Sequence, residues 1–292
     1  MTPPPAALSA PALAPLPSLV VEAAVRVALA EDFGDAGDIT SQACVPGDRS
    51  LCVAIVARQA GRVAGAYVAE AAFRLVDPSI RVEIETPDGD DIAAGGVIAR
   101  AEGAARSLLA AERVALNFLG RMSGVATATR ALVQAVNGTK ARITCTRKTT
   151  PGLRAFEKYA VRCGGGVNHR FGLYDAVLIK DNHIAAAGGV GAALKAAQSR
   201  LGHTVKIEIE VDTLDQLKEA LAHGPDIVML DNMSTENLKR AVTLANGRSI
   251  LEASGNVALD TVRAIAQTGV DVISSGAITH SAPCLDIGLD VM

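Results

Sequence analysis

Short apolar runs recur at an even spacing through the second half of the chain. Four of them begin 21, 23 and 22 residues apart, at 205–210, 226–231, 249–252 and 271–274. Each interval leaves room for one helix, which is the pattern of parallel strands joined by right-handed crossovers. Strands expected at about 141–145 and 176–180 extend the series to at least six units. We therefore predict a (β/α) barrel-type domain with parallel strands in preference to an open doubly wound sheet.

The first half of the chain lacks this rhythm. Its apolar spacing predicts helices and strands in mixed order: helices at 18–31, 68–76 and 107–136, and strands at 51–57 and 80–85. The last of these helices is a long helical zone that is dented at Gly120 and Gly124. Helices and strands that mix in this way predict an α+β domain of about a hundred residues.

Three segments follow from these patterns. Residues 1–17 are rich in Pro and Ala and are expected to form a disordered tail. Residues 18–122 form the N-terminal α+β domain, and residues 123–292 form the (β/α) barrel catalytic domain. The last residues of the barrel domain are free to return to the N-terminal domain.

Composition places the chain among globular enzymes. The 292 residues are 49% hydrophobic and 20% charged, and none of their apolar runs approaches a membrane span, which needs about 20 residues. The first 17 residues lack the basic region that begins a signal peptide. The five cysteines form no CxxC pair: Cys44, Cys52, Cys145, Cys163 and Cys284. An odd number of cysteines argues against a disulfide framework, so we expect a cytoplasmic enzyme with reduced thiols and no membrane partner.

Charge is distributed unevenly along the chain. The chain carries 28 basic and 31 acidic residues, a formal charge of −3, yet residues 140–180 hold nine basic residues and two carboxylates. Glycines and short apolar runs are interleaved with these cations, which is typical of a folded cleft that binds an anion. Aromatic residues make up 3% of the chain. An acidic remainder and so few aromatics make nucleic acid a poor partner, so binding of RNA to the basic segment is disfavoured.

The predicted ends of the barrel strands bring together three kinds of residue. In barrels of this type the active site lies at the carboxyl ends of the strands. Those ends carry the cations Arg147, Lys148 and Lys180, the carboxylates Glu210 and Asp231, and the loops Ser254-Gly255-Asn256 and Ser275-Gly276-Ala277. Two carboxylates on adjacent strand ends can share a Mg²⁺ ion, and small-residue loops after the last strands suit phosphate. The combination predicts a pyrophosphate-bearing substrate and an anionic second substrate.

Each of these residues also has an ordinary structural interpretation. Arg147 and Lys148 can form a solvated loop pair, and Lys180 can extend from a strand end into water. Glu210 can pair with a nearby lysine, and Asp231 can cap the next helix. Two further groups have the same ambiguity: His169 as a structural histidine, and Arg154, Lys158 and Arg162 as a solvated helix face.

Five blocks of sequence resemble the quinolinate phosphoribosyltransferase family. They are TRKTTPG at 146–152, GGGVNHRFGL at 164–173, LIKDNH at 178–183, LEASGN at 251–256 and GAITH at 276–280. They occur in the family's order, and the resemblance runs from about residue 18 to the C-terminus. It implies an α+β domain followed by a barrel, with quinolinate, phosphoribosyl pyrophosphate and Mg²⁺ as ligands. The implied products are nicotinate mononucleotide, pyrophosphate and CO₂, in de novo NAD biosynthesis.

The resemblance also implies a role for each matching residue. Arg147, His169 and Arg170 match positions that bind the quinolinate carboxylates. Lys148 and Lys180 match catalytic lysines at the meeting of the two substrates, and Glu210 and Asp231 match a catalytic acidic pair at the ribose and metal. The loop residues match substrate-binding positions: Ser254, Gly255, Asn256, Ser275, Gly276 and Ala277. A homodimer is implied, in which Arg113 reaches the neighbouring subunit's site.

Two other enzymes remain open on the sequence. A paralogous barrel transferase would act on a different acidic heterocycle, although the density of cations around Arg147 and Arg170 favours a dicarboxylate. A Schiff-base aldolase would use Lys148 or Lys180 as its amine, but the cations around both lysines are better suited to an anion.

Overall fold

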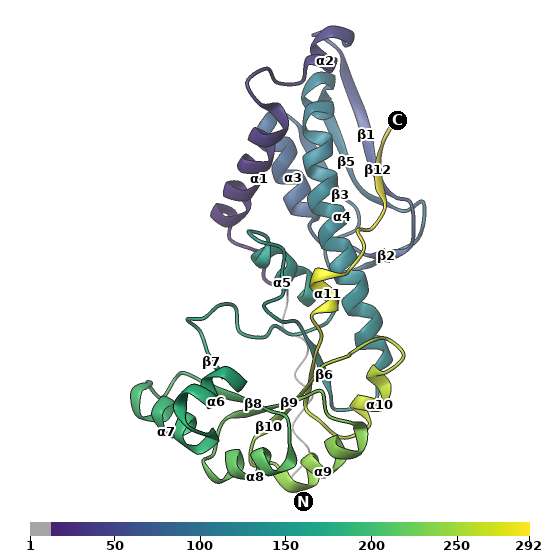
Figure 1. The fold of residues 1–292 in the computed structure, drawn as a ribbon. Helices are drawn as coiled ribbons and strands as arrows, with labels where there is room; N and C mark the ends of the chain where they lie inside the picture. The colour runs from purple at the N-terminus through teal and green to yellow at the C-terminus, as the bar shows by residue number, and fades with distance from the viewer. Residues whose placement is uncertain (1–12) are drawn as a thin grey trace, which may run out of the picture.

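The computed structural model describes residues 13–292, which form two parts linked by one long helix (Figure 1). Residues 1–12 of the predicted tail lie outside the described residues. Residues 13–17 have no helix or strand, and the Leu16 N–H donates a hydrogen bond of 3.1 Å to the Tyr67 hydroxyl. The first described helix, α1 (Ser18–Phe33), begins directly after them.

The N-terminal part consists of helices packed beside an antiparallel sheet. Its elements are α1, α2 (Ile39–Cys44), β1 (Ser50–Ala57), β2 (Gly61–Arg62), α3 (Ala66–Val76), β3 (Arg81–Ile84), β4 (Asp91–Ile92), β5 (Val97–Ala104) and α4 (Ala105–Ala135). Helices α1, α3 and α4 lie alongside one another next to the sheet (Figure 1). Phe73, Leu108 and Leu119 are fully buried there, and each buried side chain of this size stabilises the fold by about 1.5–3 kcal/mol.

The last strand of the chain joins this sheet, although the other strands of the sheet come from the first part of the sequence. The strand order is β12–β1–β5–β3, and the last strand, β12 (Ile287–Val291), pairs antiparallel with β1. Ile55 of β1 lies opposite Leu289 on one side and Ala99 on the other. The C-terminal strand therefore fastens the second part of the chain to the first.

Helix α4 runs without a break through the two glycines at which the sequence predicted a dent. A side chain at Gly124 would place its Cβ 2.0 Å from the Pro283 carbonyl oxygen, and one at Gly120 would lie 3.0 Å from the Leu285 oxygen. The two glycines thus let the segment before β12 cross close over α4 without breaking the helix. The predicted boundary at 122–123 falls inside α4, which contacts both parts of the molecule.

The second part alternates strands and helices. Its elements are β6 (Arg142–Thr144), α5 (Arg154–Cys163), β7 (Val177–Ile179), α6 (Asp181–Ala187), α7 (Val190–Arg200), β8 (Ile207–Val211), α8 (Leu214–Ala222), β9 (Ile227–Asp231), α9 (Thr235–Ala245), β10 (Ile250–Ser254), α10 (Val262–Ala266), β11 (Val272–Ser274) and α11 (Ala277–His280). Side-chain caps begin several of these helices. Thr213 accepts from the Gln216 N–H at α8, and Ser234 accepts from the Asn237 N–H at α9.

The six strands are parallel and follow a barrel order. That order is β6–β11–β10–β9–β8–β7, so the first strand of the domain lies beside the last. Among residues 13–292, β6 and β7 share no ladder, and an isolated bridge between Thr144 and Val167 borders this seam. The predicted fold class, an α+β domain followed by a (β/α) barrel-type domain, is confirmed.

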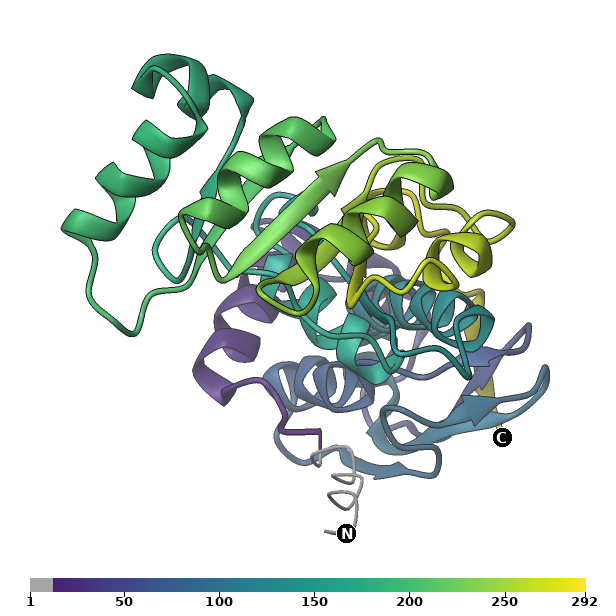
Figure 2. The ribbon, with the colours of Figure 1, turned by 90° about the horizontal axis from the view of Figure 1, so that it is seen from below.

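The two parts lie on opposite sides of the molecule when it is seen from below (Figure 2). Helices α6 to α9 of the barrel occupy one side and the helices α1 and α3 the other, and α4 lies between them with α5 packed against it. Over the described residues, the structure contains no helix with the length and apolarity needed to cross a membrane.

Candidate active site

A cavity of about 680 Å³ opens at the carboxyl ends of the barrel strands. This is the edge at which barrel enzymes carry their active sites. All but one of the predicted site residues line it: Arg147, Lys148, His169, Arg170, Lys180, Glu210, Asp231, Ser254, Gly255, Asn256, Ser275, Gly276 and Ala277. The sequence therefore located the cavity, although these residues come from segments more than a hundred positions apart.

Seven other lining residues were not predicted: Thr146, Leu178, Met229, Asn232, Val257, Ser274 and His280. Most of them flank a predicted site residue, so the strand-end rule could have included them. His280 differs, because α11 returns it to the cavity from beyond the last strand. The GAITH block at 276–280 contains this histidine, although the strand-end rule does not reach it.

Arg113 is the predicted site residue outside this cavity. Its side chain is 63% exposed on α4, and its guanidinium lies 3.9 Å from the Glu112 carboxylate. An exposed arginine at this place is available to a neighbouring subunit. Its predicted role across an interface stays a prediction.

Two guanidinium groups form the cation-rich side of the cavity. Arg170 Nη1 donates to the Ala176 carbonyl at 3.1 Å. The Nε groups of Arg147 and Arg170 are buried and have no hydrogen-bond partner anywhere in 13–292. Burial lowers the pKa of Arg170, and the neighbouring charge of Arg147 lowers it further. Two guanidiniums that repel each other and retain free donors form an arrangement suited to a ligand with more than one negative charge.

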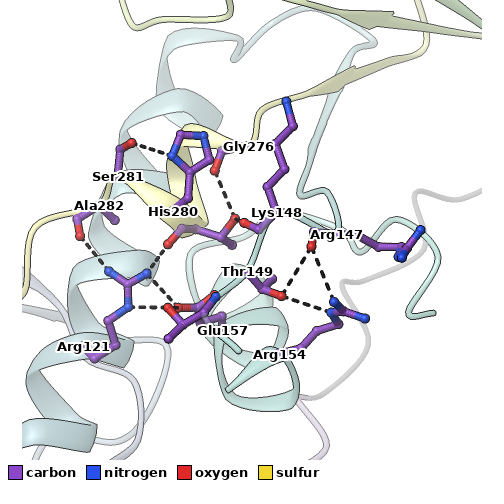
Figure 3. A network of polar contacts seen from close by, with 12 residues as sticks. Arg121, Arg147, Lys148, Thr149, Arg154, Glu157, Gly276, His280, Ser281 and Ala282 are labelled. Atoms are coloured by element: carbon purple, nitrogen blue, oxygen red, sulfur yellow. Dashed lines mark hydrogen bonds and ion pairs between the residues drawn. The ribbon is translucent and has the colours of Figure 1, made fainter. Parts of the chain in front are cut away.

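Lys148 leaves the same loop as Arg147 in a different direction (Figure 3). Its side chain is exposed, whereas its backbone is fixed by two threonines. The Lys148 N–H donates to Thr146 Oγ1 at 3.0 Å, and its carbonyl accepts from Thr279 Oγ1 at 2.7 Å. A Cβ on Gly276 would lie 3.0 Å from Lys148 Cδ, so the glycine leaves room for the lysine chain.

Lys180 and Glu210 form an ion pair across neighbouring strands. Lys180 Nζ lies 2.5 Å from Glu210 Oε2, and the lysine side chain is 45% exposed against 13% for the glutamate. The lysine therefore is not simply solvated, and the carboxylate does pair with a lysine. Both groups line the cavity, so an incoming anion would compete with Glu210 for the ammonium group.

Asp231 lies in a chain of polar groups at the ends of β9 and β10. Asn232 Nδ2 donates to Asp231 Oδ2 at 2.6 Å, and Asn256 Nδ2 donates to Asn232 Oδ1 at 3.4 Å. Gly255 has φ +99°, and a Cβ there would lie 2.0 Å from Asn232 Oδ1. Only glycine fits this approach. The helix after β9 is capped by Ser234, so Asp231 is not its cap.

His169 is more enclosed than the sequence suggested. Its Nε2 lies 3.0 Å from Glu208 and 3.6 Å from Glu252, and its Nδ1 accepts from the Arg170 N–H at 2.8 Å. Both ring nitrogens thus face protein groups, although the ring borders the cavity. Burial lowers the pKa of His169, but the close contact with Glu208 and the charges of the two carboxylates outweigh it and raise the pKa. The bond from the Arg170 N–H opposes this by favouring the neutral ring.

The two carboxylates beside His169 are themselves buried. Burial and the charge of Glu208 raise the pKa of Glu252 to about 7. Three atoms of this cluster, one from each residue, lie within 4.8 Å of one another. The accepting Nδ1 leaves the proton of a neutral ring on Nε2, which suits a hydrogen bond to a carboxylate better than a metal bond. His169 as a direct ligand of the substrate stays a prediction.

One structural interpretation from the sequence is wrong. Arg154, Lys158 and Arg162 do not form a solvated face, because Lys158 is 1% exposed. Its Nζ donates to the His169 carbonyl at 2.9 Å and contacts Cys145 Sγ at 3.1 Å. Helical spacing alone cannot reveal this, since both partners lie outside α5: Cys145 directly after β6 and His169 in the loop before β7.

The fold and cavity define a two-domain barrel protein with an anion-binding mouth, and comparisons with known proteins name its family. Residues 38–123 match the description "Quinolinate phosphoribosyl transferase, N-terminal domain", and residues 125–290 match the corresponding C-terminal domain. The chain belongs to the quinolinate phosphoribosyltransferase family.

Individual relatives agree with this placement. A protein of Bacillus subtilis named probable nicotinate-nucleotide pyrophosphorylase (carboxylating) is 46% identical over 89% of this chain and 90% of its own length. A mitochondrial quinolinate phosphoribosyltransferase (decarboxylating) of Nicotiana glauca is 44% identical over 94% of this chain and 83% of its own length. The solved nicotinate-nucleotide pyrophosphorylase of Francisella tularensis is 42% identical, with a TM-score of 0.91 over 95% of this chain and 98% of that one.

Proposed function

We propose that this chain transfers the phosphoribosyl group of phosphoribosyl pyrophosphate to quinolinate and removes one carboxylate. The products are nicotinate mononucleotide, pyrophosphate and CO₂, as a step of de novo NAD biosynthesis. The observation that carries this proposal is the pair Arg147 and Arg170, two guanidinium side chains that line one cavity and whose Nε groups have no hydrogen-bond partner in the described chain. Membership of the family supplies the identity of the substrates.

Quinolinate suits this side of the cavity. It carries two adjacent carboxylates, and planar guanidinium groups bind carboxylates through paired hydrogen bonds that a lysine cannot reproduce. Arg147 and Arg170 supply the guanidiniums. A ligand of charge −2 also relieves the mutual repulsion that lowers the pKa of Arg170.

The opposite side of the cavity suits phosphoribosyl pyrophosphate. Ser254-Gly255-Asn256 and Ser275-Gly276-Ala277 present backbone groups at the ends of β10 and β11, where barrels bind phosphate. Glu210 and Asp231 would hold Mg²⁺, because hard carboxylate oxygens facing an open cavity are the ligands this ion takes together with phosphate oxygens. Mg²⁺ would neutralise charge on the departing pyrophosphate.

The reaction then requires little covalent work from the protein. The pyridine nitrogen of quinolinate is the nucleophile, and departure of pyrophosphate builds positive charge at the ribose C1. Glu210 and Asp231 can stabilise that charge. Lys148 and Lys180 border both halves of the cavity and orient the two anions toward each other. Loss of CO₂ leaves an electron pair on the ring carbon next to the alkylated nitrogen, and a proton replaces the carboxylate there.

Product formation tests the proposal directly. The protein is incubated with quinolinate, phosphoribosyl pyrophosphate and Mg²⁺, and nicotinate mononucleotide and CO₂ are followed together. Equal amounts of both support the proposal. The control replaces quinolinate by nicotinate, which has one carboxylate fewer. Turnover of nicotinate alone would favour the paralogous transferase, and no turnover of either would contradict the assignment.

The Mg²⁺ assignment has its own test. Calorimetric titration with phosphoribosyl pyrophosphate is compared with and without Mg²⁺ for the natural protein and for Asp231→Asn. We expect Mg²⁺ to strengthen binding to the natural protein and to do so much less for the variant. Equal enhancement in both would remove Asp231 from the metal site.

We also propose a cytoplasmic homodimer in which Arg113 acts in the neighbouring subunit's site. The free thiols of all five cysteines suit a reducing compartment, and the exposed Arg113 side chain is available to a partner. Mixing Arg113→Ala with Lys148→Ala subunits tests the exchange. Reassortment restores one complete site in each hybrid dimer, or about a quarter of the natural activity at equal mixing. No recovery would place Arg113 in its own subunit's site or outside catalysis.

A further inference from the structure

Arg121, which also lies on α4, donates hydrogen bonds from all three of its guanidinium nitrogens. Arg121 Nε and Nη2 donate to Glu157 Oε1 at 3.0 and 2.7 Å, Nη1 donates to the Ala282 carbonyl at 2.8 Å, and Nη2 also donates to the Thr279 carbonyl. Figure 3 shows these contacts converging on one guanidinium. The cavity lining found over residues 13–292 includes neither Arg121 nor Glu157.

Glu157 connects this arginine to the loop after β6. Its Oε1 accepts from Thr150 Oγ1 at 2.7 Å, and its Oε2 accepts from the Thr150 N–H at 3.1 Å. Thr150 lies two positions after Lys148 in the sequence. The carboxylate therefore fixes both the side chain and the backbone of the loop that carries Lys148.

Thr279 closes the network from the other side. Its Oγ1 contacts the carbonyls of Lys148 and Gly276 at 2.7 and 3.0 Å, while its own carbonyl accepts from Arg121. The connections thus return to their start through Lys148, Thr279, Arg121, Glu157 and Thr150. This closed set of contacts, which we name the Arg121 clamp, joins the Lys148 loop to α11 and the glycine before it.

Burial makes the Arg121 clamp rigid. The Arg121 side chain is 19% exposed and that of Glu157 is fully buried. A charge in such a place requires its partner, because water cannot replace it, so the loops cannot move apart without stranding a charged group. A fully satisfied polar network of this kind favours one arrangement over its alternatives.

The neighbouring Arg147 is anchored by a different residue. Arg154 Nε donates to Thr149 Oγ1 at 3.0 Å, and Arg154 Nη2 contacts the Arg147 carbonyl at 3.5 Å. The Arg121 clamp therefore reaches Lys148 and Gly276, while Arg154 holds Arg147. Lys148 and Arg147, although adjacent in sequence, are therefore held in place by different residues.

We propose that Arg121 and Glu157 are positioning residues for the transferase reaction, holding Lys148 against Gly276 at the meeting of the two substrates. This inference rests on the proposed function. It makes turnover, and not quinolinate affinity, the quantity that the Arg121 clamp controls.

Kinetics of Arg121→Lys and Glu157→Gln, both near in shape to the natural residues, test this directly. We expect kcat to fall about 100-fold, the size of effect that a displacement of about 1 Å produces, while the quinolinate dissociation constant changes less than about threefold. The control is Arg62→Lys, because Arg62 is 18% exposed in an ion pair with Asp91 and lies apart from the cavity. It should leave kcat unchanged. A parallel loss of kcat, quinolinate affinity and melting temperature would indicate a structural role alone and overturn the inference.

Thr279 supplies a milder variant should the charged substitutions fail to fold. Thr279→Ser keeps the hydroxyl that contacts the Lys148 carbonyl, whereas Thr279→Val removes it at equal size. We expect serine to retain kcat within about twofold and valine to lose about tenfold. Equal activity of both variants would exclude the Thr279 connection and with it the Arg121 clamp.

Hydrogen exchange separates this inference from the proposed function. In Glu157→Gln, we expect amides at 146–150 and 276–280 to exchange faster together, with 168–172 unchanged. An inactive natural protein would contradict the proposed reaction, and the exchange pattern would then decide whether the Arg121 clamp exists. Unchanged exchange in both segments would overturn the clamp whether or not the natural protein is active.

Discussion

At the cavity wall, Arg147 and Arg170 keep buried Nε groups without a partner in the described structure, whereas Arg121, one layer beneath, has all three guanidinium nitrogens bonded. The same side chain thus serves two purposes at two depths. Arg121 donates its hydrogen bonds to loop carbonyls and to the buried carboxylate of Glu157. The upper pair is left free for an anionic ligand. The arginine side of the site is therefore preorganised, because the loops that carry Arg147 and Lys148 are held in place before a ligand arrives.

Removing Lys148 should produce the largest effect at the wall. Lys148→Ala is expected to lower kcat about 10³-fold, equivalent to about 4 kcal/mol of transition-state stabilisation. Folding should survive, because Thr279 bonds the Lys148 carbonyl and not its ammonium group. Steady-state kinetics and thermal melting check both expectations, with Lys195→Ala as an exposed control on α7. Turnover within threefold of the natural protein would exclude Lys148 from the reaction, a threshold of about 0.7 kcal/mol.

The buried cluster of His169, Glu208 and Glu252 should make the stability of the folded protein depend on pH. Burial and the charge of Glu208 raise the pKa of Glu252 from 4.5 to about 7. The folded state then binds more protons than the unfolded state between these values, so the free energy of unfolding falls as pH rises through them. The fall is on the order of 3 kcal/mol. It should be complete above the raised pKa.

Glu252→Gln should remove most of that slope. Urea unfolding at several values between about pH 4.5 and about pH 8 measures it. Besides burial, the groups that act on the pKa of Glu252 are Glu208, which raises it, and His169 and Ser274, which lower it. The raised pKa of His169 gives a slope of the same sign above its ordinary value of 6.5, so the variant should retain a smaller decline there. The exposed control Glu236→Gln should keep the full slope. An identical slope in Glu252→Gln would show that Glu252 is ionised in the folded protein.

Truncating either wall arginine should mainly weaken quinolinate binding. Arg147→Ala and Arg170→Ala are each expected to raise the quinolinate dissociation constant about 10- to 100-fold, or about 1.4–2.8 kcal/mol. Lysine at either position should recover only part of this, because an ammonium group cannot form the paired bonds of a guanidinium. Calorimetry checks the values, with Arg142→Ala as the control at the exposed, opposite end of β6. Unchanged affinity in both alanine variants would place the carboxylate pocket elsewhere.

The residues that line the cavity could be predicted from the sequence because the carboxyl ends of parallel barrel strands all lie at the same edge of the barrel. The repeat spacing placed the strands within a few residues of β8, β9, β10 and β11. Residues at their carboxyl ends must share one edge of the sheet, so Glu210 and Asp231 could be assigned to one cavity without knowing any contact. Local periodicity was sufficient for this part of the fold.

The contacts of the residues behind the cavity wall could not be predicted from strand ends in this way. Arg121 and Glu157 are 36 positions apart in sequence, and nothing in their separate helices distinguishes them from surface residues. Lys158 and Glu252 are likewise buried by elements that are distant in sequence. Gly120 and Gly124 suggested only a dent in α4, and nothing in the sequence indicated that they accommodate a segment some 160 positions later. Contacts of this kind depend on how the helices and strands pack against one another, and local sequence patterns do not determine that packing.

Gly276→Ala should have the smallest effect, because it disturbs Lys148 without removing it. Gly276 has φ −74° and ψ −26°, which alanine adopts freely, so the backbone itself is not strained. The new Cβ would lie 3.0 Å from Lys148 Cδ and 3.2 Å from the His280 ring. A flexible lysine chain can yield by a few tenths of an ångström. We therefore expect kcat to fall less than about tenfold, which is less than about 1.4 kcal/mol.

The kinetic constants decide between two consequences of this substitution. If the methyl group acts through Lys148, kcat falls while the KM for phosphoribosyl pyrophosphate stays the same. If the glycine instead bounds the phosphate site, that KM rises, because a Cβ blocks close approach to the backbone. Gly47→Ala is the matched control, since its Cβ would lie 3.9 Å from Arg106 in ordinary contact. A loss as large as that of Lys148→Ala, with KM unchanged, would mean that the lysine has no freedom to yield and that the Arg121 clamp extends to the side chain itself.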